Sequence, residues 1–376
     1  MKLFRELKRW VLDLPSWRTH NPILTIESDD WGSIRMSSSQ ARDALKSLGH
    51  TIEANPYQLY DGLETNEDID RLQEVLREVS GISGLGAVFT LNYCAANPDF
   101  EKIEEANFKR YFREPFHQTY QTYSKSQDVI EKVKNGVHGE VFEVQFHGAE
   151  HLNVNRWMRA LQKGDKQTRE AFYEGIFSPA IASSTGYTME YMDALDYDNR
   201  SEITQQIQSL NEGLNIFREV WGESPQSFIA PCYRWGKPIE DFLAANSIYF
   251  IQGQRAQLHP KNEPGFSQRK IYRYTGQKNK LGQIYSVRNV IFEPSLYGQK
   301  QALIMAKQQI RYAFKWKLPA IVSSHRINYT SRLDQTNRES SLAALKELLH
   351  WVKNEYTDVA FLGSSALSER IKKTKR

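Results

Sequence analysis

Two pairs of residues in this sequence have the types and the spacing of a metal site. Asp29 and Asp30 are adjacent after the apolar run 23–26, and His147 and His151 lie four positions apart after a second apolar run. Adjacent carboxylates are costly to bury unless a partner keeps them charged. On a helical turn, side chains four positions apart project to one side, so both imidazoles can bind one ion. One Asp oxygen then completes a three-ligand site with open positions.

The ion that this donor set favours is a divalent metal. Mixed carboxylate and imidazole ligation suits zinc best, although nickel, cobalt, manganese and iron accept the same donors. An ion with open positions lowers the pKa of bound water to about 7 and polarises a carbonyl group, as hydrolysis of an amide or ester requires. A neighbouring carboxylate then takes the proton of the water, and a histidine on the opposite wall protonates the leaving group. Asp29 and His325 are the candidates for these two roles.

A repeating pattern of strands and helices must position these residues. Short runs rich in Val, Ile and Phe alternate with helical stretches, which is typical of βα units. The predicted strands are 23–28, 86–91, 141–146, 227–230, 248–251, 283–287, 320–324 and 359–362, and the predicted helices are 67–80, 154–175, 202–221, 238–246, 299–316 and 337–355. Seven or eight such units predict an α/β fold, a distorted (β/α)7-8 barrel. A barrel gathers the carboxyl ends of its strands on one face, so the candidate residues are expected to meet there.

Composition limits the classes of protein that fit. The chain of 376 residues is expected to form one barrel domain over residues 1–376. Its apolar content of 40% supports a large core, and a net charge of +4 does not indicate nucleic-acid binding. With only Cys94 and Cys232, a disulfide framework is excluded. The sequence contains neither a run of membrane-spanning length nor a secretory signal pattern, so we expect a cytoplasmic protein.

Four motifs resemble those of the polysaccharide deacetylase family, also called the NodB-homology carbohydrate esterases. They occur in the family's order, between residues 23 and 326, and are Asp29-Asp30, His147-x-x-x-His151, Ala230-Pro231-Cys232-Tyr233 and Val322-Ser323-Ser324-His325. The resemblance implies a distorted (β/α) barrel that removes acetyl groups, N- or O-linked, from a carbohydrate by metal-dependent hydrolysis. It also implies a role for each site residue: Asp29 as base, His325 as acid, and Asp30, His147 and His151 as metal ligands.

Two positions depart from the family pattern. Gly148 stands where Ser or Thr usually follows the first histidine, and Ile229 stands where an arginine usually orients the base. Arg234, three residues past Pro231, is the candidate to reach the same carboxylate from another backbone position. The sequence therefore predicts a divergent branch of the family.

Residues next to the motifs are predicted to contact the sugar. Aromatic rings stack on pyranose faces, and polar side chains beside them orient hydroxyl groups. The predicted substrate-binding residues are Trp31, Asn153, Pro231, Tyr233 and Arg234. We also expect the backbone amide of Tyr233 to stabilise the oxyanion.

Three segments depart from the repeating pattern. Residues 1–15 have the spacing of a basic amphipathic helix, which either packs on the core or, through residues 1–14, contacts an anionic membrane surface. Residues 97–139 and 255–282 are predicted to be insertions. The aromatic side chains of the first insertion form either a small core of their own or a sugar-stacking lid; they are Tyr111, Phe112, Phe116, Tyr120 and Tyr123.

Other functions fit parts of the pattern. Residues 147–151 also match the His-x-x-Glu-His signature of inverzincin proteases, which requires a helix, whereas the alternation over 140–146 predicts a strand. A glycosidase on a related barrel would use Asp29 with a second carboxylate about 5 to 9.5 Å away and no metal. A carbohydrate-binding protein that had kept the barrel without its chemistry would bind metal and hydrolyse no acetylated sugar.

Overall fold

A nine-stranded parallel sheet forms the centre of the computed structural model, which describes residues 10–53, 55–81, 84, 86–178, 191–260 and 270–374. Its strands run in the order β10 (Ile284–Val287), β7 (Phe250–Gly253), β6 (Ser227–Ile229), β5 (Phe142–Phe146), β2 (Phe89–Tyr93), β1 (Ile23–Trp31), β12 (Ala320–His325) and β11 (Val290–Ile291). A short strand, β13 (Ala360–Phe361), pairs with the start of β1. Each of the eight predicted strands overlaps one of these strands.

Two residues close the sheet into a barrel. β10 pairs with β7 at one edge and β11 pairs with β12 at the other, yet only Arg288 and Asn289 separate β10 from β11 along the chain. The backbone N–H of Arg288 donates to the carbonyl of Gly253 at 2.9 Å, and that of Asn289 donates to the carbonyl of Ile321 at 3.0 Å. The chain thus passes from one edge of the sheet to the other within a dipeptide. The predicted distorted (β/α) barrel is confirmed.

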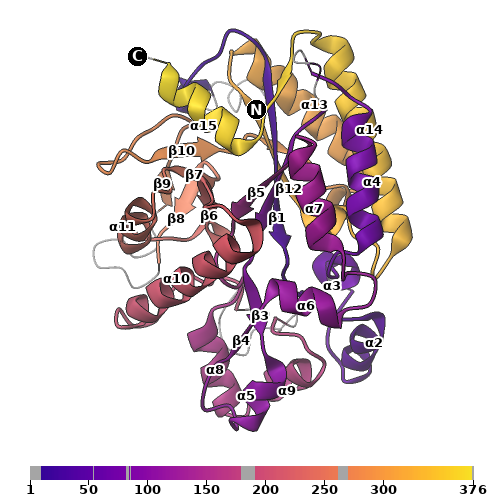
Figure 1. Cartoon of the computed structure of the whole chain (residues 1–376), viewed down its shortest axis with the longest axis vertical. Helices are drawn as coiled ribbons and strands as arrows, with labels where there is room; N and C mark the ends of the chain where they lie inside the picture. The colour runs from indigo at the N-terminus through magenta and orange to yellow at the C-terminus, as the bar shows by residue number, and fades with distance from the viewer. Residues whose placement is uncertain are drawn as a thin grey trace.

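Helices cover the outside of this barrel (Figure 1). On one side lie α4 (Asn66–Arg77), α7 (Val129–His138) and α14 (Gln335–Glu355), with α13 (Gln299–Lys315) against α14, and on the other lie α10 (Glu202–Trp221) and α11 (Lys237–Ala245). α15 (Ser364–Lys373) lies at the end where the strands begin. Apolar side chains between sheet and helices, such as Leu72 and Phe217, are completely buried and form the main core.

The segments that follow the carboxyl ends of β1, β2 and β5 gather in a lower lobe (Figure 1). They include α2 (Ser39–Ser47), α3 (Pro56–Tyr60), β3 (Ala96–Pro98), α5 (Phe100–Glu105), β4 (Arg113–Pro115), α6 (Phe116–Thr122), α8 (Val154–Gln162) and α9 (Lys166–Tyr173). β3 and β4 pair as an antiparallel hairpin. A smaller core that includes Trp157 and Phe172 holds much of the lobe together. The lobe therefore stands over the end of the barrel where the candidate residues were expected.

The prediction of one helix over 154–175 is wrong in one respect. α8 ends at Gln162 and α9 begins at Lys166. Between them Gly164 adopts a left-handed conformation, with φ of 71°, which ends α8 because glycine is the residue that enters this region without steric penalty. The Asp165 side chain then accepts a hydrogen bond from the Thr168 amide at 2.9 Å and caps α9.

The aromatic residues of segment 97–139 pack mostly into cores. Phe116 and Tyr120 are completely buried in the main core, and Tyr123 packs against it. Tyr111 and Phe112 pack against the smaller core of the lobe. This burial leaves little of these rings for a lid, and the rings join two larger cores instead of forming a separate core of their own.

Some predicted segments lie partly outside the described residues. Of the N-terminal helix, residues 1–9 are outside, and residues 10–13 are helical. Of segment 255–282, residues 261–269 are outside, and β8 (Ala256–Leu258) pairs with β9 (Lys270–Tyr272) on either side of them. In the described part of the chain, no helix combines the length and apolar character that crossing a bilayer requires.

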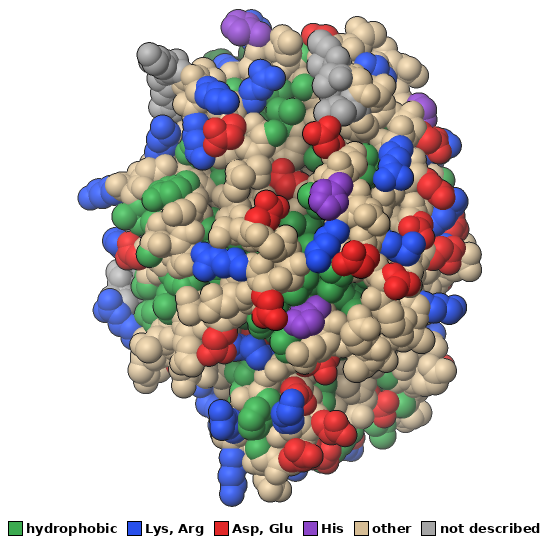
Figure 2. All heavy atoms as spheres, in the orientation of Figure 1, with side chains coloured by type: hydrophobic (Ala, Val, Ile, Leu, Met, Phe, Trp, Pro, Cys, Tyr) green, Lys and Arg blue, Asp and Glu red, His purple; other side chains and the backbone are tan. Residues whose placement is uncertain are grey.

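Figure 2 shows basic and acidic side chains interspersed over one face.

Candidate metal centre

The end of β1 delivers two carboxylates to one cavity. Asp29 pairs in register with His325 on the neighbouring β12. In a regular strand, adjacent side chains point to opposite faces. Here the pairing of β1 with β2 shifts between Ser28 and Trp31, and Asp30 within this bulge has φ of 75°. A bulge re-aims side chains, and both Asp29 and Asp30 line the same cavity.

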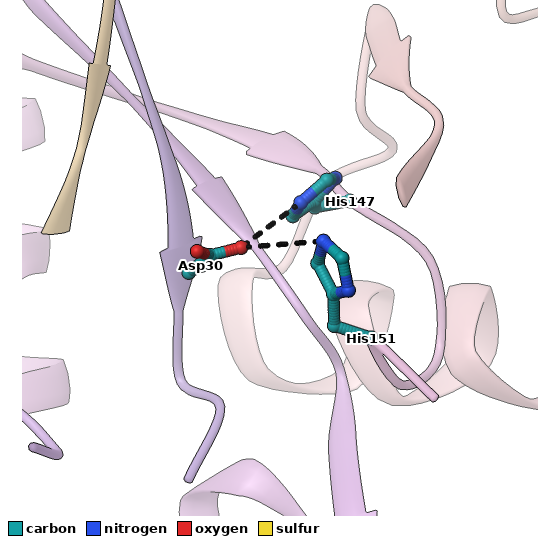
Figure 3. Close-up of side chains that lie close together, drawn as sticks. All are labelled: Asp30, His147 and His151. Atoms are coloured by element: carbon teal, nitrogen blue, oxygen red, sulfur yellow. Dashed lines mark ion pairs between the residues drawn. The ribbon is translucent and has the colours of Figure 1, made fainter. Parts of the chain in front are cut away.

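Asp30, at the end of β1, lies next to His147 and His151 of the loop that follows β5 (Figure 3). The Asp30 Oδ1 atom lies 3.3 Å from His147 Nε2 and 3.6 Å from His151 Nε2. One potential ligand atom from each residue lies within 4.8 Å of those of the other two, and all three side chains are buried. The structure therefore brings together the three residues predicted to be metal ligands.

Hydrogen bonding leaves the right atoms available to a cation. His147 Nδ1 lies 2.9 Å from the carbonyl of Ile229, which can only accept, so Nδ1 carries the proton. The lone pair of Nε2 then faces Asp30, and this buried nitrogen has no hydrogen-bond partner among the described residues. A buried polar atom without a partner is unusual, and a bound cation would satisfy it. The donor set fits a divalent metal.

The protonation states also fit a cation. Burial would raise the pKa of Asp30, but His151, His147 and Arg35 together hold it well below the ordinary value. Burial lowers the pKa of His151 to about 3. An ionised carboxylate and a neutral imidazole are the forms that bind metal.

Asp29 is held by an arginine that the sequence analysis missed. Arg288 donates from Nη1 and Nη2 to the two oxygens of Asp29, at 2.6 and 2.7 Å. Asn92 Nδ2 donates to Oδ1 at 2.9 Å. Burial would raise the pKa of Asp29, but the Arg288 guanidinium outweighs it and lowers the pKa. Asp29 is thus fixed in position as an ionised carboxylate.

The expectation that Arg234 reaches this carboxylate is wrong. Arg234 Nη1 donates to the carbonyl of His259 at 2.6 Å, and its Nε lies 3.8 Å from carboxylate oxygens of Asp193 and Asp196. These partners draw the guanidinium into a buried ion cluster. Arg288 stands at the dipeptide that closes the barrel, directly after a predicted strand. Its place directly after the predicted strand 283–287 is the signal in the sequence that points to it.

His325 is paired with a second missed residue, Glu293. Its Nδ1 lies 2.6 Å from Glu293 Oε1, and its Nε2 lies 3.8 Å from Asp29 Oδ2. Burial would lower the pKa of His325, but the Glu293 carboxylate raises it well above the ordinary value. Asn328 Nδ2 donates to the other oxygen of Glu293 at 2.7 Å. His325 is thus held as an imidazolium beside an ionised Asp29.

Several predicted substrate-binding groups have other uses. Trp31 is completely buried in the main core and donates to Ser28 Oγ at 3.0 Å, so its ring is not open to a sugar. Asn153 caps α8 and donates to the carbonyls of Asp193 and Asp196. The amide of Tyr233 donates to the carbonyl of Ala230 at 2.9 Å within a short turn, which removes it as an oxyanion donor.

A cavity of about 530 Å³ surrounds the centre. Besides Asp29, Asp30, His147, His151 and His325, its walls include Arg35, Asn55, Tyr57, Tyr233, Gln254, Glu293 and Tyr297. Arg35 Nη2 lies 3.5 Å from Asp30 Oδ2, and its guanidinium stacks on the Tyr57 ring at 4.8 Å. Pro231 instead lines a neighbouring cavity on the other side of the histidine loop. Tyr233 is therefore the predicted contact residue that faces the centre.

The protease interpretation does not fit this geometry. Residues 147–153 form a loop rather than a helix, so the predicted helical turn at the histidine pair is wrong. The Glu150 carboxylate binds Arg113 Nε at 2.8 Å in the lower lobe. A glutamate engaged there is not available as the base of an inverzincin.

Comparison with known proteins finds the same barrel elsewhere. No family model and no curated protein sequence matches the chain. A solved structure assigned as a glycoside hydrolase/deacetylase from Parabacteroides distasonis aligns with a TM-score of 0.50 at 9% identity, over 96% of this chain and 74% of that one. Two structures assigned as polysaccharide deacetylases also align. The one from Mycobacterium smegmatis has a TM-score of 0.43 at 12% identity, over 95% of this chain and 93% of that one. The one from Pseudomonas aeruginosa PAO1 has a TM-score of 0.47 at 10% identity, over 92% of this chain and 89% of that one.

Proposed function

We propose that this protein is a metal-dependent hydrolase that removes an acetyl group, N- or O-linked, from a carbohydrate. One observation carries the proposal: beside three residues that could hold a metal ion, the Asp29 carboxylate and the His325 imidazole face each other at 3.8 Å, and Arg288 and Glu293 hold them in place. Pairs of titratable groups whose surroundings push their pKa values apart mark a base and an acid.

The chain's residues have distinct tasks in this proposal. Asp30, His147 and His151 would hold the ion, which supplies polarisation of the acetyl carbonyl and a more acidic water. Asp29 accepts a proton from the attacking water, and its two bonds to Arg288 keep the receiving oxygens in place. As the bond between the acyl carbon and the leaving nitrogen or oxygen breaks, His325 donates its Nε2 proton to that atom. Glu293 holds His325 by Nδ1 and so leaves Nε2 for the reaction.

The substrate class rests on the cavity and on the fold. Tyr57, Tyr233 and Tyr297 place aromatic and hydroxyl groups around the centre, and Asn55 and Gln254 add amides. Such a mixture suits a sugar, which presents apolar ring faces and many hydroxyls. Zinc is the proposed ion because two imidazoles and one carboxylate form its usual open site.

Acetate release from a panel of N- and O-acetylated sugars tests the proposal. We expect wild-type protein to release acetate when loaded with zinc and to lose this activity in a chelator. His147→Ala should be inactive, whereas His138→Ala, which changes an exposed histidine on α7, should match wild type. Acetate release that persists in the chelator would contradict metal dependence.

A further inference from the structure

Glu150 stands between the two histidine ligands, but it faces away from them. It is 4% exposed and points into the lower lobe. Tyr111 Oη and Arg113 Nε donate to its Oε1 at 3.0 and 2.8 Å, and Ser209 Oγ donates to its Oε2 at 3.1 Å. We call Tyr111, Arg113 and Ser209 the Glu150 clamp.

The clamp joins two elements that lie on either side of the histidine loop. Arg113 belongs to β4, and Ser209 belongs to α10. Arg113 Nη2 donates to Ser209 Oγ at 3.0 Å, and its Nη1 binds Glu212 on the same helix. A single guanidinium thus connects the hairpin, the helix and the carboxylate of the loop. The planar, multiply donating head of arginine suits this role.

The backbone of the loop is held by α10 and by residues at the start of β3, the strand that pairs with β4. The amides of Ala95 and Ala96 donate to the carbonyls of Gly148 and Ala149, at 3.0 and 2.7 Å. On the opposite side, a Cβ added at Gly213 of α10 would lie 2.7 Å from the Ala149 Cα, so the helix backbone rests directly on the loop. Residues 148–150 are therefore fixed from both sides, although the loop has no helical hydrogen bonds of its own.

We propose that the Glu150 clamp positions His147 and His151 and thereby sets the metal affinity of the centre. This inference rests on the proposed function, because it requires the two histidines to bind metal. In an isolated strand-to-helix loop, the separation of the two imidazoles would vary, whereas metal binding requires ligand distances within about 0.2 Å of ideal values. Fixing Glu150 fixes the chain between the two ligands. The lower lobe thus contributes to the centre without supplying a ligand.

Zinc affinity of the folded protein tests the clamp. We compare wild type with Tyr111→Phe, Arg113→Ala and the control Arg110→Ala by competition with a chromogenic chelator, and we record the visible spectrum of the cobalt-loaded forms. Loss of an outer contact in a metal site typically weakens affinity about 10- to 100-fold, and we expect the lower end for Arg113→Ala. Tyr111→Phe removes only a hydroxyl and should weaken zinc a few-fold. Arg110 is exposed and stacks on Phe112 at 4.9 Å, so Arg110→Ala should match wild type.

The outcomes separate the clamp from the proposed function. Weaker zinc binding and an altered cobalt spectrum in the two clamp variants, with no change in Arg110→Ala, support the clamp. Unchanged zinc affinity in folded Arg113→Ala overturns it, and if that variant does not fold, unchanged affinity in Tyr111→Phe overturns it instead. A purely structural role would lower the melting temperature and leave zinc affinity intact. If zinc affinity falls in the two clamp variants as expected but zinc-loaded wild type releases no acetate, the clamp stands and only the proposed hydrolysis is contradicted.

Discussion

Two halves of the centre are built by different means. The proton-handling half, in which Asp29 and His325 are the proposed base and acid, lies on the adjacent strands β1 and β12. Its partners are Arg288, where the barrel closes, and Glu293, which follows β11. The metal half takes Asp30 from a bulge and both histidines from a loop that the lower lobe braces. The barrel therefore fixes the proposed acid and base directly, whereas the proposed metal ligands depend on contacts added outside the barrel. Damage to one half should leave the other intact.

The largest expected effect, loss of activity without loss of zinc, is that of Asp29→Asn. The amide cannot accept the water proton, and general-base catalysis typically contributes about 10²- to 10⁴-fold. We therefore expect acetate release to fall by about this factor while bound zinc stays at the wild-type level. Steady-state rates and elemental analysis of the same preparation measure both. Loss of zinc in this variant would mean that the two halves are not independent.

Arg288→Met should damage the proton-handling half and also the fold. The side chain is buried between Glu27 and Asp29, and breaking a buried ion pair typically costs about 3–5 kcal/mol. Because Arg288 lowers the pKa of Asp29, its loss should raise that pKa. The base would then be ionised only at higher pH, so the acidic limb of the pH–rate profile should shift to higher pH.

Arg234→Met is the comparison for this variant. It breaks a different buried ion cluster, with Asp193 and Asp196. Chemical denaturation should show a loss of stability, but the acidic limb of the profile should not move. A shift of equal size in both variants would contradict the assignment of Arg288 to Asp29.

Glu293→Gln should have a smaller effect that is visible mainly at high pH. Glu293 raises the pKa of His325, so the amide should lower it. His325 must be protonated to act as an acid, and activity is therefore lost as pH rises through its pKa. We expect the basic limb of the rate profile to move to lower pH, while the acidic limb and the zinc content stay the same. An unchanged basic limb would exclude His325 as the titrating acid.

The effect of zinc on stability should be the smallest effect in this series. A ligand that binds only the folded state stabilises it by about 2.7 kcal/mol at a concentration 100 times its Kd. We expect zinc to raise the melting temperature of the chelator-treated wild type by a few degrees and to have no effect on His147→Ala. An equal rise in both proteins would place the zinc elsewhere.

The sequence predicted the parts of this site that local patterns encode. Apolar runs located the strands, and the residues that follow them placed Asp29, Asp30, His147, His151 and His325 on one face. The sequence did not predict the roles of Arg288 and Glu293, because these roles depend on the closure of the barrel between β10 and β11. The closure brings the two residues next to the side chains that they hold. Long-range pairing of this kind leaves no periodic signal.

Residues that look alike in sequence also differed by burial and hydrogen bonding. Trp31 directly follows one site motif and Tyr233 ends another, but Trp31 packs into the core, whereas Tyr233 lines the cavity. The amide of Tyr233 is used by its own turn. Whether a polar group is free for a ligand depends on backbone conformation, and the residue type alone does not determine it.

Bound zinc in wild type, Asp29→Asn and His147→Ala tests the central claim most directly. All three proteins are loaded with zinc, separated from free ion and measured by elemental analysis. The account predicts a full complement in wild type and in Asp29→Asn and none in His147→Ala, because Asp30, His147 and His151 hold the ion while Asp29 handles the proton. Zinc retained by His147→Ala at the wild-type level would contradict it.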